Sequence, residues 1–202
     1  YIIVANPCDI LTYQFYKTSG LKPNQIMGTG TLLDSARLRA RIAEYYYLTQ
    51  TNVHGYVFGE HGDSSFVPWS LANIATIPLL EYEPSIQNKD DVFPPLDFDD
   101  VENYIKKSGS KIIQEKGATY YAIAATTCHL VDCVDNVMDS TLTVSTLLNG
   151  EYGIDDVALS ILCVVGSSGI KSHLIAPLKD DEILKLRHSA DCLKDIIKQL
   201  KF

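Results

Sequence analysis

The sequence predicts an α/β fold that is α+β in its main part, and three observations support this. Residues 1–5 form a continuous apolar, β-branched run typical of a buried parallel strand, and a helical pattern follows it directly. Long amphipathic helical patterns fill much of the middle and the end of the chain. Apolar runs over 142–148, 157–165 and 169–174 resemble strands of an antiparallel sheet.

Each expected element follows from its pattern. The helices share apolar positions at helical spacing; they cover residues 7–19, about 32–48, 99–116, 119–138 and 180–200. The strands are short apolar runs; they cover residues 1–5, 25–28, 54–59, 142–148, 157–165 and 169–174. The remaining segments are the turns at 28–31, 149–150 and 166–169, a mixture of strand and loop over 67–77, and an irregular stretch over 78–95.

Four residues are expected to mark the starts and ends of helices. Pro7 suits the first position of a helix, with Asn6 as its cap. Gly20 would end that helix, and Gly117 would separate the two long helices in the middle of the chain.

Composition and charge narrow the possible functions. The 202 residues carry a net charge of −8 and a pI of about 5.0, which argues against binding nucleic acid or an anionic membrane surface. The longest apolar run, 157–165, is too short to span a bilayer, and no secretory signal pattern is present, so we expect a cytoplasmic protein. Five scattered cysteines indicate buried free thiols rather than disulfides or a metal site; they are Cys8, Cys128, Cys133, Cys163 and Cys192.

Two clusters of charged residues indicate acid/base chemistry. Asp34 and Arg37 lie three residues apart, so on a helix they share a face. His61 lies between Gly59 and Gly62, where the backbone can turn and hold an imidazole open to a cleft. A carboxylate that orients a histidine, with a guanidinium that binds an anion, suits acid/base chemistry on a carboxylate substrate. The alternatives are a plain ion pair between Asp34 and Arg37 and a turn histidine that caps a neighbour.

These clusters belong to an ordered set of motifs that runs along the whole chain. The set comprises Asn6-Pro7-Cys8-Asp9, Leu33-Asp34-Ser35-Ala36-Arg37, Gly59-Glu60-His61-Gly62-Asp63-Ser64 and Lys116-Gly117-Ala118-Thr119-Tyr120-Tyr121-Ala122-Ile123. It resembles the lactate/malate dehydrogenase family, and most of all the bacterial-type L-lactate dehydrogenases. The resemblance implies that residues 1–24 are the end of a Rossmann domain and that 25–202 are the mixed α+β C-terminal catalytic domain.

The resemblance also implies roles for individual residues. His61 would exchange a proton with the ketone oxygen of a 2-oxo acid, and Asp34 would orient His61. Arg37 would bind the substrate carboxylate through two parallel hydrogen bonds. Asn6 would contact the ketone oxygen and the nicotinamide end of the cofactor, which is NAD. Thr119 would contact the small side chain of the substrate.

Further implied roles concern the cofactor and regulation. Val4 and Ile123 would line the nicotinamide site, and Thr119 and Ile123 are expected on one helix face, four residues apart. Arg39 and His54 match positions that bind fructose 1,6-bisphosphate at a subunit interface, although they could equally be two exposed polar residues. The family is typically dimeric or tetrameric, so a homo-oligomer is expected. No metal is implied.

The departures from the family pattern limit what the chain is expected to do. The sequence starts within a strand and without Met, and it contains no GxGxxG dinucleotide fingerprint and no counterpart of the family's mobile loop. We therefore expect a fragment or a truncated chain that binds NAD poorly and has little activity alone. Two alternatives stay open: malate dehydrogenase specificity, and a non-catalytic oligomerisation or interaction module.

Overall fold

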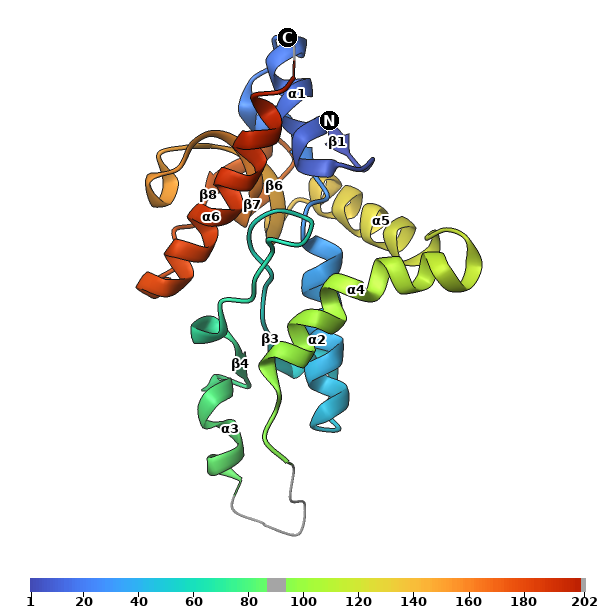
Figure 1. Ribbon diagram of the computed structural model, residues 1–202, viewed down its shortest axis with the longest axis vertical. Coiled ribbons are helices and arrows are strands. Elements are labelled where there is room, and N and C mark those ends of the chain that lie inside the picture. The colour runs from blue at the N-terminus through green and yellow to red at the C-terminus, as the bar shows by residue number, and fades with distance from the viewer. Residues whose placement is uncertain (87–93, 201–202) are drawn as a thin grey trace.

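A five-stranded mixed sheet lies near one end of the computed structural model, which describes residues 1–86 and 94–200 (Figure 1). Its order is β1-β2-β6-β7-β8. β1 (Ile2–Ile3) pairs in parallel with β2 (Met27–Gly28), and all other pairs are antiparallel. Those pairs involve β6 (Ser140–Asn149), β7 (Asp155–Gly166) and β8 (Gly169–His173). The parallel pair and the antiparallel meander together confirm the predicted α/β, α+β fold.

Helices cover this sheet and bury its centre. α1 (Cys8–Ser19) and α6 (Asp180–Ile197) contact each other and β7, and α5 (Tyr121–Asp135) also contacts β7. Ten of the twelve residues of β7 are buried or half-buried in an unbroken run, as expected for a strand covered on both faces. The main hydrophobic core is therefore built around β6 and β7.

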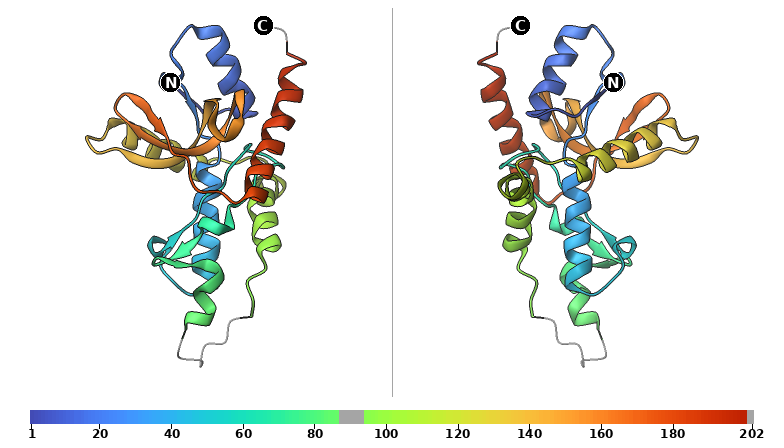
Figure 2. Two further views of the ribbon diagram at one scale, coloured as in Figure 1. Left: turned by 90° about the vertical axis from the view of Figure 1, so that its left-hand side faces the viewer. Right: turned by 90° about the vertical axis from the view of Figure 1, so that its right-hand side faces the viewer.

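A second part of the molecule has its own hydrophobic core. It contains α2 (Leu32–Tyr45), α3 (Leu79–Ser85), α4 (Phe98–Lys116) and a small antiparallel sheet. That sheet is formed by β3 (Val53–His54), β4 (Asn73–Ile74) and β5 (Ile77–Pro78). Figure 2 shows α2 running from the large sheet down into this second part, so that α2 belongs to both.

Short 3-10 turns and helix ends complete the described chain. The 3-10 turns are η1 (Pro23–Gln25), η2 (Gln50–Asn52), η3 (Trp69–Leu71) and η4 (Glu151–Gly153). Gly20 and Gly117 both adopt left-handed backbone conformations at helix C-termini, which confirms that they end α1 and α4. No helix in the described ranges has the length and apolarity needed to cross a lipid bilayer.

Several details at the N-terminus differ from the sequence prediction. The first strand is parallel, but its residues are half-buried and Val4 is 39% exposed, because β1 is an edge strand of the described sheet. Asn6 is not the cap of α1, since Pro7 occupies the cap position and no side-chain capping bond is formed there. The prediction that Asn6 caps the helix and that Pro7 is its first residue was therefore wrong.

The middle of the chain differs in three places. The expected strand at 54–59 is reduced to Val53–His54, because Phe58 and Gly59 make single bridges to Phe66 and to β7 instead of continuing one ladder. α2 ends at Tyr45, earlier than expected, and Tyr47 has a positive φ of 52°. Part of the segment expected to be irregular forms α3, whose N-terminal cap is a proline; residues 87–93 of that segment lie outside the described ranges.

Candidate active site

A cavity of about 580 Å³ is lined by residues from several helices and loops and includes most of the predicted site residues. Its lining comes from the segment after β1, the β2–α2 turn, α2 and the loop after residue 58. Further lining residues come from α4, the α4–α5 connection and α5. The lining includes Val4, Asn6, Asp34, Arg37, His61, Thr119 and Ile123.

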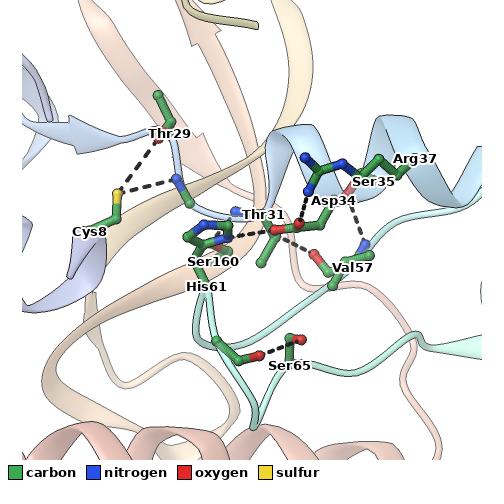
Figure 3. A network of polar contacts seen from close by, with 12 residues as sticks. Cys8, Thr29, Thr31, Asp34, Ser35, Arg37, Val57, His61, Ser65 and Ser160 are labelled. Atoms are coloured by element: carbon green, nitrogen blue, oxygen red, sulfur yellow. Dashed lines mark hydrogen bonds and ion pairs between the residues drawn. The ribbon is translucent and has the colours of Figure 1, made fainter. Parts of the chain in front are cut away.

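Asp34 and His61 form the central contact of this cavity (Figure 3). His61 Nδ1 lies 2.6 Å from Asp34 Oδ2, and the two side chains are 28% and 9% exposed. The hydrogen bond to Asp34 raises the pKa of His61 above its usual value, against the opposing effect of burial. Because Nδ1 is engaged by the carboxylate, Nε2 is the ring nitrogen left to exchange a proton with a bound molecule.

Arg37 lies beside the same carboxylate and lines the same cavity. Its Nη1 is 3.4 Å from Asp34 Oδ1, and its side chain is 16% exposed. A single contact at this distance is a weak bond, and in the described part of the chain it is the one hydrogen bond the Arg37 side chain makes. The guanidinium therefore keeps donors available for a carboxylate ligand.

Side-chain hydroxyls of the residue that caps α2 and of its first turn fix the segment that leads to His61. Thr31 Oγ1 donates to the carbonyl oxygen of Val57 at 2.5 Å, and the N–H of Val57 donates to Ser35 Oγ at 2.9 Å. Gly30 has a positive φ of 45°, and a Cβ there would lie 2.2 Å from Ser160 Oγ, so only glycine suits this turn. These contacts fix the chain that carries His61 to the helix that carries Asp34.

Asp9 also belongs to this network, although no role was predicted for it. Asp9 Oδ2 accepts a hydrogen bond from the main-chain N–H of His61 at 2.7 Å, and Oδ1 accepts one from Ser145 Oγ at 2.5 Å. Burial raises the pKa of Asp9 to about 6. An acidic residue in the first turn of a helix is ordinary, so the sequence contains no signal that this carboxylate is buried against the site.

The residues expected near the cofactor also line this cavity. Val4 and Ile123 offer apolar surface, Asn6 offers an amide, and all three lie in the same cavity as His61. Thr119 does not lie on the helix that carries Ile123, because Gly117 ends α4 and α5 begins only at Tyr121. The predicted helical pairing of Thr119 with Ile123 was wrong, but both residues line the cavity.

Arg39 and His54 lie outside this cavity and share a separate one of about 230 Å³. Arg39 Nη1 donates to the carbonyl oxygen of Gly55 at 3.2 Å, and its guanidinium lies 6.0 Å from the centre of the Tyr56 ring. His129 on α5 adds a second imidazole to this cavity.

The cysteines are free thiols, as predicted, but not all of them are buried. Cys8, Cys133 and Cys163 are buried, Cys192 is half-buried and Cys128 is exposed on α5. Within residues 1–86 and 94–200, no three histidine, cysteine or acidic side chains are grouped closely enough to hold a metal ion.

Comparison with known proteins places this site in context. A family model described as the lactate/malate dehydrogenase α/β C-terminal domain matches residues 31–201. The chain is 45% identical over 200 residues to an L-lactate dehydrogenase of Thermoanaerobacterium saccharolyticum, an alignment that covers 99% of this chain and 63% of that protein. It is 46% identical over 202 residues to L-lactate dehydrogenase 2 of Clostridium acetobutylicum, covering 98% and 61%.

Solved structures give the same result. The structure of an L-lactate dehydrogenase from Clostridium thermocellum is similar with a TM-score of 0.89 and 37% identity, covering all of this chain and 65% of that one. A lactate dehydrogenase from a deep-sea metagenome library is similar with a TM-score of 0.89 and 33% identity, covering 98% and 62%. This chain thus spans less than two thirds of the length of these relatives.

Proposed function

This chain belongs to the lactate/malate dehydrogenase family, and from that premise we propose that it carries the substrate-binding and proton-transferring part of an NAD-dependent L-lactate dehydrogenase. The observation that carries the proposal is the 2.6 Å contact between His61 and Asp34 at the wall of a cavity that Arg37 also lines. A histidine with a carboxylate partner and a nearby guanidinium suits proton transfer to a 2-oxo acid that is held by its carboxylate.

The residues of the chain would divide the work of pyruvate reduction as follows. Arg37 would bind the pyruvate carboxylate through two N–H donors, which orients the ketone toward His61. Protonated His61 would donate the proton on Nε2 to the ketone oxygen and become neutral, keeping Nδ1–H on Asp34. In the oxidation of lactate, neutral His61 would accept the hydroxyl proton at Nε2. Asp34 stabilises the imidazolium and fixes which nitrogen carries the exchangeable proton.

The lining of the cavity suits the nicotinamide end of NAD. Val4 and Ile123 would contact the flat ring, and the amide of Asn6 could bond both to the carboxamide end and to the substrate oxygen. When bound, the reduced cofactor supplies the hydride that reduces the ketone carbon. The sequence has no GxGxxG fingerprint, so we propose that this chain alone binds NAD weakly and turns over little substrate.

A chimera tests this function directly. The N-terminal portion of the Thermoanaerobacterium saccharolyticum relative, up to its counterpart of Tyr1, would be joined to this chain. We expect the chimera to oxidise NADH with pyruvate, and His61→Gln to reduce kcat roughly 100-fold or more because the proton donor is lost. A folded chimera without pyruvate reductase activity would contradict the proposal, and a preference for oxaloacetate would assign malate dehydrogenase specificity instead.

The smaller cavity supports a separate proposal on assembly and regulation. Arg39 and His54 share it, and a ligand with two phosphates, such as fructose 1,6-bisphosphate, would place one phosphate against these groups in each of two copies of the chain. We expect this ligand to increase the sedimentation coefficient or the activity of the chimera. Arg39→Gln should abolish the response while leaving the basal activity unchanged, and a response that persists in this variant would exclude the site.

A further inference from the structure

Asp9 is a buried carboxylate whose two bonds both lead away from its own helix. It is the second residue of α1 and is 3% exposed. One oxygen accepts from the main-chain N–H of His61 and the other accepts from the hydroxyl of Ser145 on β6. An acidic residue that only stabilised the N-terminus of α1 would bond to N–H groups of α1 itself, so its bonds indicate another purpose.

The carboxylate has no cation at bonding distance. Within the described ranges, Asp9 takes part in no salt bridge, and its partners are a main-chain amide and a hydroxyl. Burying an ionised carboxylate without a cation is unfavourable, and a neutral amide of the same shape would avoid that cost. The negative charge of Asp9 is therefore explained better by its effect on the neighbouring His61 than by a contribution to the stability of the fold.

We propose that Asp9 is a positioning residue for His61. Asp9 holds the main chain of His61 against β6, because the same carboxylate bonds to Ser145. It also places a second negative charge near the imidazole. The inference rests on the proposed function in that His61 is the proton-transferring group. Asp34 fixes the ring from the α2 side, and Asp9 fixes the backbone from the α1 side. Two carboxylates on separate elements thus hold one histidine.

The charged groups around His61 determine in which direction its pKa should change when Asp9 is neutralised. Besides Asp9, the groups that act on His61 are Asp34 and Arg37 on α2; Asp34 and Asp9 raise its pKa and Arg37 lowers it. Besides His61, Asp9 is influenced by the adjacent Glu60, whose negative charge opposes its ionisation. Neutralising Asp9 should therefore favour the uncharged form of His61.

Three variants separate charge from bonding. Asp9→Asn keeps an acceptor for the N–H of His61 but removes the charge, whereas Asp9→Ala removes both. Asp63→Asn is the matched control, since Asp63 is an exposed acid two residues from His61 whose charge is screened by water. The titration of each variant is followed by NMR on the ring proton of His61 in the 202-residue chain, identified among five histidines by its absence in His61→Gln.

We expect Asp9→Asn to lower the pKa of His61 by about 0.5 or more, and Asp63→Asn to change it by less than about 0.2. The main-chain N–H of His61 should exchange with solvent roughly tenfold faster in Asp9→Ala than in Asp9→Asn. Equal titration midpoints in Asp9→Asn and Asp63→Asn would overturn the proposal.

A further variant covers the case in which substitutions at Asp9 prevent folding. Ser145→Ala removes one donor from the carboxylate, which favours its neutral form, so the pKa of His61 should again fall. An unchanged His61 titration in Ser145→Ala would then refute the proposal. None of these measurements uses cofactor or substrate, so their outcome is independent of whether the chimera reduces pyruvate.

Discussion

The buried charge of Asp9 should make this chain less stable at neutral pH than in mild acid. Burial raises the pKa of Asp9 from the ordinary value of 3.8 to about 6. An acid whose pKa is higher in the folded state contributes its full stability below pH 3.8 and loses it as the pH rises through 6. The difference of 2.2 (6 minus 3.8) corresponds to about 3 kcal/mol at pH 8.

Asp9→Asn removes this titration while keeping the shape of the side chain. The amide oxygen can still accept from the N–H of His61, and the amide N–H can donate to Ser145 Oγ. We therefore expect the free energy of unfolding of Asp9→Asn, relative to the wild type, to increase by roughly 2.4 kcal/mol between pH 4 and pH 8. At pH 4 the carboxyl is mostly protonated in the folded wild type, so the two proteins should differ least at that end of the range.

Urea denaturation at several pH values provides the assay. The single tryptophan, Trp69, belongs to the hydrophobic core around α2, whereas circular dichroism reports on both parts of the molecule. The two probes must give coincident transitions for one free energy of unfolding to apply. Asp63→Asn again serves as the control, because removing an exposed charge should leave the pH dependence unchanged.

Parallel pH profiles for the wild type and Asp9→Asn would refute this reasoning. They would mean that Asp9 ionises in the folded chain as readily as in water. If the variant is stabilised while the pKa of His61 falls, the same substitution has improved the fold and weakened the site. A gain in stability together with a weakened site is expected where a buried charge is retained for function.

Three further predictions concern the residues around the cavity. Asp34→Asn should lower the pKa of His61 by about 1 or more, measured by the same NMR titration, because the directly bonded charge is lost; an unchanged value would exclude the pairing. Arg37→Lys in the chimera should raise KM for pyruvate roughly tenfold or more with a smaller effect on kcat, because lysine cannot donate two parallel hydrogen bonds. An unchanged KM would exclude the proposal that Arg37 binds the substrate carboxylate. Gly30→Ala should destabilise the chain by about 2 kcal/mol or more in urea, since its Cβ would lie 2.2 Å from a serine oxygen on β7. Gly20→Ala, at a φ of 69° in open space, measures the backbone strain alone, so an equal loss of stability in both variants would contradict the steric argument.

The long periodic patterns and the ordered motifs were the most informative parts of the sequence. α4, α5 and α6 begin within a few residues of their predicted positions because each buries one apolar face, and that spacing is visible in the sequence. β6, β7 and β8 were likewise predicted as antiparallel strands. The proximity of Asp34, Arg37 and His61 also followed from the motifs, although their chemical roles stay predictions.

Local geometry around prolines and glycines was harder to predict. The pair Asn6-Pro7 suggested an asparagine cap, yet the proline itself takes the cap position. Thr119 was expected on a helix, but Gly117 turns the chain and the helix restarts only two residues after Thr119. Apolar periodicity does not distinguish a helix from the residues just before it, so element boundaries are the least determined feature.

The contacts that fix His61 could not be predicted because they join side chains to main-chain groups far away in the sequence. Thr31 and Ser35 bond to the two polar groups of Val57, and Asp9 bonds to the N–H of His61, 52 residues along the chain. A hydroxyl or carboxyl in or next to a helix carries no sequence sign of which distant main-chain group it will contact. Each of these bonds satisfies a backbone group that β-ladders leave unpaired in the segment from Val57 to His61. The same feature that breaks the expected strand at 54–59 therefore creates the site: a segment with few ladder bonds must be held by side chains, and those side chains determine where the histidine points.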